Sequence, residues 1–251
     1  LDIEALRREA RANAAANEIR AVVPNAQLDV RLVDLSSLTS IRSFAGEFLA
    51  DYDRLDVLMN NAGLVSSKQV TTEDGFEQTL QVNHLGHFLL TALLKGLLLA
   101  SAPSRVVHVA SVMHRFSDGN LEDLNWAKGW GSVRTYNLSK LLNVLFSNEL
   151  ANRLQGTGVT SNAAHPGGVA SNFGFGAGNA ASRLKFITKA VLRSPSNGAR
   201  TQVRLAADPS LATSTGGYYA NSKPKKPSRT ARDVDRQRRL WELSEELLGL
   251  A

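Results

Sequence analysis

Short apolar segments rich in β-branched residues alternate with helical patterns along most of this 251-residue chain. Strands buried on both faces of a parallel sheet have such continuous apolar sequences, whereas helices carry apolar residues at every third or fourth position. The alternation predicts an α/β fold with a doubly wound parallel sheet between helical layers, in three αβα layers. The predicted strands are Gln27 to Val33, Val57 to Asn60, Arg105 to Ala110, Val159 to Ala163 and Gly217 to Ala220, and the predicted helices are Leu38 to Ala50, Gly75 to Leu98, Val133 to Leu154, Gly198 to Ala206 and Ala231 to Leu248.

The composition favours a single domain that spans residues 1–251. With 43% hydrophobic residues the chain can bury one sizeable core, and no repeat or low-complexity linker divides it. Cysteine is absent, which excludes disulfides and thiol catalysis and favours a cytoplasmic setting. No run approaches the ~18 apolar residues needed to span a bilayer, and no secretory leader is recognisable, so we expect no integral membrane segment.

Tyr136 and Lys140 are the first candidates for chemistry. They lie four residues apart at the start of a predicted helix, so they share one helix face. A free phenol has a pKa of about 10, and an adjacent ammonium would lower that pKa and let the pair move a proton. Ser111 follows a predicted strand, at the carboxyl edge where open parallel sheets bind ligands.

Further motifs occur in a matching order along the chain. Asn60-Asn61-Ala62-Gly63 ends a predicted strand, Asn83 lies in the next helix, and Pro166-Gly167-Gly168-Val169 follows a later strand. Together with Ser111 and the Tyr-x-x-x-Lys spacing, these motifs resemble the short-chain dehydrogenase/reductase family. Over nearly its whole length the chain is similar to the retinol-dehydrogenase-like and WW-domain-oxidoreductase-like branch of that family.

The resemblance implies a Rossmann-like domain that transfers hydride between a nicotinamide cofactor and a carbonyl or alcohol carbon. Tyr136 would act as acid or base, and Ser111 would donate a hydrogen bond to the substrate oxygen. Lys140 would lower the Tyr136 pKa and hold the nicotinamide ribose, and Asn83 would hold a water of the proton relay. The cofactor-binding residues that the family motifs imply are Arg7, Asp34, Leu35, Asn60, Ala62, Gly63, Tyr136, Lys140, Pro166, Gly167 and Val169.

Two of these assignments carry further expectations. Arg7 would follow the second strand of the family fold, and a basic residue there suits a 2′-phosphate, so NADP(H) is expected to be preferred over NAD(H). Asp34 would contact adenine together with Leu35. The alternative role for Asp34 is a helix cap for the residues that follow it.

One departure from the family is its missing first unit. The family opens with a strand and a T-G-x-x-x-G-x-G turn that holds the cofactor pyrophosphate, and this chain has no such turn. We therefore expect an N-terminally incomplete domain, without the first strand and first helix, that binds NADP(H) weakly and associates through unpaired strand edges. Ile3 to Val23 is rich in helix formers, so the second strand could coil or join the helix. The cluster Gly174 to Gly178 has the wrong context for a dinucleotide loop and favours a flexible loop near the substrate.

The substrate is expected to be a small hydrophobic carbonyl compound or alcohol. Asn172 to Ser194, where the family builds its lid, mixes phenylalanine and aliphatic residues with glycines. Trp126 and Trp130 either line the substrate mouth or pin the loop before Tyr136. His84 and His87, three residues apart, could bind a metal, but no Cys or carboxylate accompanies them, so core packing is favoured and no metal is expected.

The net charge of +6 leaves two other classes of function open. The first is a non-catalytic relative that serves as an interaction or scaffold protein. The second is polyanion binding, which is disfavoured because acidic residues interleave with the basic ones and no aromatic ladder accompanies them, so no nucleic acid is expected as partner. The basic cluster comprises Lys223, Lys225, Lys226, Arg229, Arg232, Arg236, Arg238 and Arg239.

Overall fold

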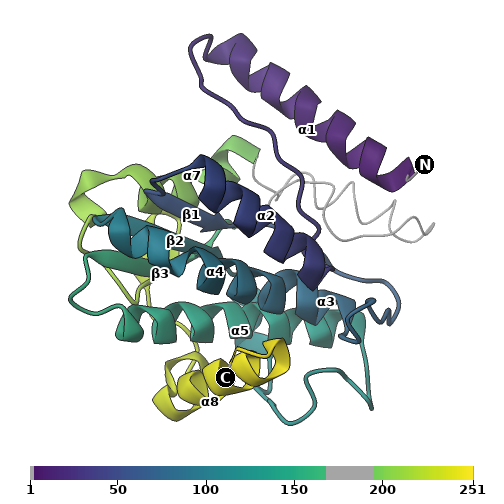
Figure 1. Ribbon diagram of the computed structural model, residues 1–251. Helices are drawn as coiled ribbons and strands as arrows, with labels where there is room; N and C mark the ends of the chain where they lie inside the picture. Colours follow the sequence, from purple (N-terminus) through teal and green to yellow (C-terminus); the bar gives the residue numbers. More distant parts are fainter. Residues whose placement is uncertain (1–2, 168–194, 251) are drawn as a thin grey trace.

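A five-stranded sheet organises the computed structural model, which describes residues 3–167 and 195–250 (Figure 1). The strand order is β1-β2-β3-β4-β5, and the first three pairings are parallel while the last is antiparallel. The predicted doubly wound α/β architecture is therefore confirmed for this part of the chain. The strands are β1 (Val57–Asn60), β2 (Ser104–Val109), β3 (Val159–His165), β4 (Tyr218–Ala220) and β5 (Lys223–Lys225).

Helices cover both faces of this sheet. α4 and α5 lie on one face, where α2 packs against α4 and α8 against α5. On the opposite face α7 contacts β2 and β3, and a small core of Val107, Ala164, Leu205 and Tyr219 fills the interface. The helices are α1 (Ile3–Val22), α2 (Leu38–Asp51), α3 (Gln78–Leu80), α4 (Gly86–Ala100), α5 (Ser132–Arg153), α7 (Pro195–Ala207) and α8 (Val234–Leu248).

Local sequence explains where several of these helices begin and end. The Ser37 hydroxyl caps α2 by accepting a hydrogen bond from Ser40 N, and the Asp233 carboxylate caps α8 by accepting one from Arg236 N. Gly249 ends α8 in the left-handed region, at φ 62°, where glycine has no steric penalty. The predicted start of α2 at Leu38 is therefore fixed by a polar side chain, whereas α8 begins at Val234 and not at the predicted Ala231, which lies in the short turn η4 (Thr230–Arg232).

α3 and α4 are parts of one helix and are joined by a single π-helical turn (the π-turn), η1, at Gln81–Leu85. Gly86 follows the π-turn, and a Cβ there would lie 2.9 Å from the backbone oxygen of Leu35. This glycine therefore allows the helix to pass closely beside the segment that leads into α2. Among the described residues, Gln78–Ala100 is the one helix long and apolar enough to cross a membrane, and 61% of its most apolar window is buried inside the protein.

The strand predicted at Gln27 to Val33 is wrong. The structure has no strand there, and the segment pairs with none of the five strands of the described sheet. Side chains hold the segment instead: Arg31 forms ion pairs with Asp29 at 2.6 Å and with Asp51 at 2.7 Å. Of the two outcomes left open for the N-terminal stretch, the helical one is observed, since α1 lies away from the sheet as a single helix (Figure 1).

The two ends of the described sheet differ in sequence. β5 is the short antiparallel strand Lys223-Pro224-Lys225, and all three of its residues are exposed. β1 occupies the other end and pairs with β2 on one side only. Its carboxyl end leads directly into the Asn61 to Gly63 stretch of the candidate site.

Candidate active site

Asn83 lies within the π-turn and is fully buried. Its side-chain oxygen accepts a hydrogen bond from Leu64 N at 2.8 Å, and its amide nitrogen donates to Leu64 O at 2.9 Å. The amide thus pairs with both backbone groups of the residue that follows Gly63. This arrangement joins the π-turn to the loop after β1.

Ser139 connects the same asparagine to α5. Asn83 Nδ2 donates to Ser139 Oγ at 2.9 Å, and Ser139 Oγ donates to the Tyr136 carbonyl at 2.8 Å. The hydroxyl is buried, so both hydrogen bonds form away from competing water. The π-turn and the second turn of α5 are therefore held together through one side chain.

Ser111 and Tyr136 meet at the carboxyl end of β2. Their side chains are hydrogen-bonded, and Ser111 also caps η2 (Val112–Phe116) by accepting from Met113 N at 3.3 Å. Burial raises the pKa of the Tyr136 phenol, and the Ser111 hydrogen bond opposes that rise. Desolvation of the phenol therefore outweighs the effect of Ser111, and the lowering of this pKa by Lys140 stays a prediction.

The Lys140 ammonium is buried beside the phenol, with Nζ 5.5 Å from the centroid of the Tyr136 ring. It donates to Val109 O at 3.2 Å, and Asn143 Nδ2 donates to the same carbonyl at 3.1 Å. Burial lowers the pKa of Lys140 to about 8, so the side chain is still mostly charged at neutral pH. The site therefore contains a positive charge on an ammonium that carries more N–H donors than its hydrogen bond to Val109 O uses.

The residues after β1 form a partly exposed loop next to these groups. Asn61 and Ala62 are exposed, and a Cβ at Gly63 would lie 3.1 Å from Asn83 Oδ1 and 3.4 Å from Lys140 Nζ. A Cβ at these distances would push against both side chains, so glycine favours this close approach, and the Lys140 ammonium can donate to the hydroxyl groups of a ribose. By contrast, the Asn60 side chain is buried and donates to Thr91 Oγ1 at 3.0 Å, so it faces the core.

Asp34 and Leu35 lie in the turn that precedes α2. The Asp34 carboxylate accepts from Ser36 N at 2.9 Å and from Ser36 Oγ at 2.5 Å, so it closes this turn and does not take the helix-cap role that was its alternative. The helix cap itself is Ser37. Leu35 is buried in the main core.

The remaining predicted cofactor residues are placed unevenly. Pro166 and Gly167 follow β3 directly, and Gly167 has φ 88°, which favours glycine. Val169, the glycine cluster and the predicted lid lie outside the described residues. Arg7 lies inside α1 and does not follow a strand, so the strand-end position on which the NADP(H) prediction depends is not seen. All these cofactor contacts stay predictions.

Three buried histidines underlie the site. His87 Nδ1 is hydrogen-bonded to Asn83 O at 3.1 Å, and His84 Nε2 to Ser244 Oγ at 2.9 Å. His108 Nδ1 lies 3.3 Å from Asn60 Nδ2. Burial lowers the pKa of His84 and His108 to about 3 and that of His87 to about 4, so all three are neutral near pH 7. The core-packing interpretation of His84 and His87 agrees with these contacts.

Both tryptophans of the loop before α5 make contacts that pin it. Trp126 is buried, its carbonyl accepts from Gln69 Nε2 at 2.9 Å, and the Arg134 guanidinium lies 4.9 Å from its ring centroid. Trp130 Nε1 donates to Glu77 Oε1 at 3.3 Å. Of the two roles left open, the pinning role is the one these contacts support.

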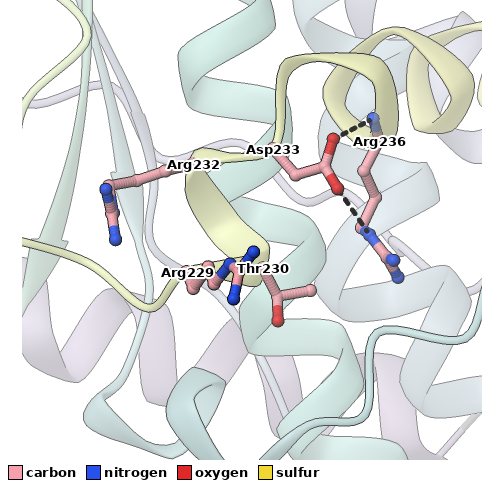
Figure 2. A pocket seen from close by; sticks show the side chains of 5 residues that line it. All are labelled: Arg229, Thr230, Arg232, Asp233 and Arg236. Carbon is pink, nitrogen blue, oxygen red and sulfur yellow. Dashed lines mark hydrogen bonds and ion pairs between the residues drawn. The ribbon is translucent and has the colours of Figure 1, made fainter.

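A cavity of about 430 Å³ lies elsewhere, at the turn before α8. Figure 2 shows Asp233 joined to Arg236, whereas Arg232 points away from that pair. Arg238 and Arg239 likewise have acidic neighbours, Asp235 at 3.8 Å and Glu242 at 3.7 Å. This pattern is that of a solvated helix face. Besides Asp233 and Arg236, the cavity is lined by Arg229, Thr230 and Arg232.

Comparison with known proteins agrees with this geometry. Residues 3–175 match the family model described as short chain dehydrogenase. The chain belongs to the short-chain dehydrogenase family. Retinol dehydrogenase 14 of Homo sapiens is 42% identical over 248 residues, which cover 98% of this chain and 74% of that relative. Retinol dehydrogenase 12 of Mus musculus is 43% identical over 243 residues, covering 94% of this chain and 74% of that relative.

Solved structures support the same family fold. An uncharacterized protein from Mycobacterium paratuberculosis superposes with a TM-score of 0.71 at 33% identity, covering 93% of this chain and 80% of that chain. The RhlG/NADP active-site complex of Pseudomonas aeruginosa gives a TM-score of 0.56 at 25% identity, covering 75% of this chain and 73% of that chain. This short-chain dehydrogenase is therefore an oxidoreductase of the retinol-dehydrogenase-like branch.

Several contacts of the site were not anticipated from the sequence. Ser139 lies three residues after Tyr136, a spacing at which a helical serine can reach back to a carbonyl, so its role could have been found. Asn143 lies three residues after Lys140, on the same face of α5. His114 contacts Ser111 but also a residue far along the chain, which no local pattern indicates.

Proposed function

We propose that this protein is an NADP(H)-dependent oxidoreductase that interconverts a hydrophobic aldehyde or ketone and its alcohol. The observation that supports this most is the hydrogen-bonded pair Ser111 and Tyr136 beside the buried Lys140 ammonium. A nicotinamide, when bound, supplies the hydride chemistry. The described residues fit its ribose at Gly63 and Lys140, while no T-G-x-x-x-G-x-G turn for the pyrophosphate exists in the sequence.

The protein's own groups would handle the proton and the developing charge. Because burial raises its pKa, the Tyr136 phenol is protonated at neutral pH and can protonate a carbonyl oxygen during reduction. Ser111 Oγ would donate a hydrogen bond to the same oxygen and stabilise its developing charge. The Lys140 charge would then stabilise the phenolate that remains.

The cofactor and substrate preferences have weaker support. The RhlG structure is described as an NADP complex, and Arg7 remains our candidate for the 2′-phosphate. The relatives are named retinol dehydrogenases, and the lid sequence at Asn172 to Ser194 is apolar, which favours a hydrophobic substrate such as retinal. We also keep a cytoplasmic setting and a homo-oligomer as parts of the proposal.

The test uses an extended protein, defined as residues 1–251 preceded by upstream-encoded residues that supply the glycine-rich turn. NADPH oxidation is measured with all-trans-retinal and with a small polar sugar such as xylose. Tyr136→Phe keeps the ring but removes the transferable proton, so turnover should fall by at least ~10²-fold while NADPH affinity changes little. Ser111→Ala should also lower turnover by removing an oxyanion donor.

The outcomes separate enzyme from scaffold. Wild-type-like turnover in Tyr136→Phe would end the assignment of that residue, and faster turnover of the sugar would reject the hydrophobic substrate. If the extended protein binds no NADPH in a titration, the non-catalytic interaction role is favoured instead. Strongly salt-dependent binding of nucleic acid would favour the polyanion role.

A further inference from the structure

The carbonyl of Ser111 is held from one side by a single residue. It accepts a hydrogen bond from His114 N at 3.2 Å and forms a second hydrogen bond with His114 Nδ1 at 2.6 Å. A carbonyl oxygen has two lone pairs, so His114 occupies both acceptor positions. The Ser111 side chain meanwhile caps η2 and reaches Tyr136. His114 therefore holds the serine carbonyl, while the neighbouring Ala110 N and Val112 N donate to Ala164 O at 2.8 Å and to His165 Nδ1 at 3.3 Å.

The other ring nitrogen of His114 faces a distant part of the chain. Ser228 N donates to His114 Nε2 at 3.1 Å, across 114 positions of sequence. Because a backbone N–H can only donate, Nε2 must be the unprotonated nitrogen and Nδ1 must carry the hydrogen. Burial lowers the pKa of His114 and favours this neutral state. One protonation state of the imidazole thus satisfies both neighbours.

The segment Ser228–Ala231 is itself anchored to the helical layer. Ser228 Oγ accepts from Ala231 N at 3.2 Å, and Ala231 O accepts from Gln237 Nε2 at 2.9 Å and from Asn148 Nδ2 at 3.2 Å. His114 is fully buried and packs edge-on against Tyr218, with ring centroids 4.9 Å apart. A hydrogen-bonded path therefore runs from α5 and α8 through His114 to Ser111.

We propose that His114 is a positioning residue for the reaction: its Nδ1–H holds the Ser111 carbonyl and thereby orients the serine. This inference rests on the proposed function, because it acts through Ser111. A serine displaced by even about 1 Å would donate poorly to the developing oxyanion, and such displacements can cost about 10²-fold in rate. The effect should therefore appear in kcat, with little change in KM.

Two substitutions separate the two ring nitrogens. Asparagine places an amide near Nδ1, so His114→Asn keeps a donor for the Ser111 carbonyl but loses the acceptor for Ser228 N. Glutamine places its amide near Nε2, so His114→Gln keeps the acceptor for Ser228 N but loses the Ser111 donor. We expect kcat for all-trans-retinal reduction by the extended protein to fall about 10-fold or more in His114→Gln and less than about 3-fold in His114→Asn.

The control is Ser117→Ala, which removes a nearby acceptor of a backbone hydrogen bond, from Gly119 N at 3.2 Å, without touching Ser111. It should leave kcat unchanged. The deciding measurement is a double-mutant cycle with Ser111→Ala. If His114 acts through Ser111, adding His114→Gln to Ser111→Ala should lower kcat no further, whereas a general loss of structure would add to it.

The outcomes distinguish this inference from the proposed function. Wild-type turnover in Ser111→Ala would reject the role of the serine itself. If Ser111→Ala lowers turnover but His114→Gln does not, only the positioning role of His114 is overturned. Equal losses in the asparagine and glutamine variants, or additive losses in the cycle, would overturn it as well.

Discussion

Acidification from pH 7 to pH 5 is expected to destabilise this protein strongly, because His84, His87 and His108 are buried without charge. Their pKa values in the folded protein are about 3, about 4 and about 3, against 6.5 for an exposed histidine. For a base with a lowered folded pKa, the unfolded chain binds more protons below pH 6.5. The stability is therefore fully present above that pH and is lost as the pH falls toward 4.

The expected size of the loss follows from proton linkage. Between pH 7 and pH 5 each unfolded histidine becomes almost fully protonated while its folded counterpart stays neutral, which costs about 2 kcal/mol per histidine. Three histidines together cost about 6 kcal/mol, and a typical domain has only about 5–15 kcal/mol of stability. Burial also lowers the pKa of His114, which adds to the loss in the same direction.

Urea unfolding of the extended protein, followed by tryptophan fluorescence between pH 5 and pH 7.5, measures this directly. In His108→Asn the slope of unfolding free energy against pH should decrease by about 1.4 kcal/mol per pH unit near pH 5, one proton's worth. The control Leu94→Ala, a buried residue of α4, should lower stability by about 2–5 kcal/mol at every pH and leave the slope unchanged. An unchanged slope in His108→Asn would falsify the neutral-histidine account.

Three other predictions concern the helix, the cofactor and the chain's own affinity. In urea titrations, Gly86→Ala should lower the unfolding free energy by about 1–3 kcal/mol, because its Cβ would lie 2.9 Å from the Leu35 carbonyl oxygen. Gly96→Ala should raise it by up to about 1 kcal/mol, because a Cβ there would meet nothing within 4 Å and alanine is the better helix former. Arg7→Ala in the extended protein should reduce the preference for NADPH over NADH. If the ratio of kcat/KM for NADPH to kcat/KM for NADH is the same in the variant and the wild type, the assignment is contradicted. Calorimetry should show residues 1–251 alone binding NADPH at least ~10-fold more weakly than the extended protein, and equal affinity would mean that other residues hold the pyrophosphate.

Local patterns found those parts of the site that neighbouring residues determine. The sequence predicted the strand before Ser111 and the shared helix face of Tyr136 and Lys140, because helix and strand periodicity depend on adjacent residues. The strand at Gln27 to Val33 was predicted wrongly because a strand also needs a partner, which is a property of the whole sheet.

Properties that depend on burial or on distant partners could not be predicted in this way. The direction of the Tyr136 pKa shift follows from how much water the fold removes around the phenol. The contact of His114 with Ser228 joins residues 114 positions apart, and the bond between His84 and Ser244 joins residues 160 positions apart. Neither pairing leaves a local signal in the sequence.

The unequal ends of the sheet also determine where another polypeptide can add to it. At β5 the proline lacks an N–H to donate, and the flanking lysines Lys223 and Lys225 repel a second copy of the same edge. β1 carries no such protection in Val57–Asn60. An added strand would therefore pair beside β1 in the described sheet, next to the loop that approaches Asn83 and Lys140, and would change the surroundings of that loop.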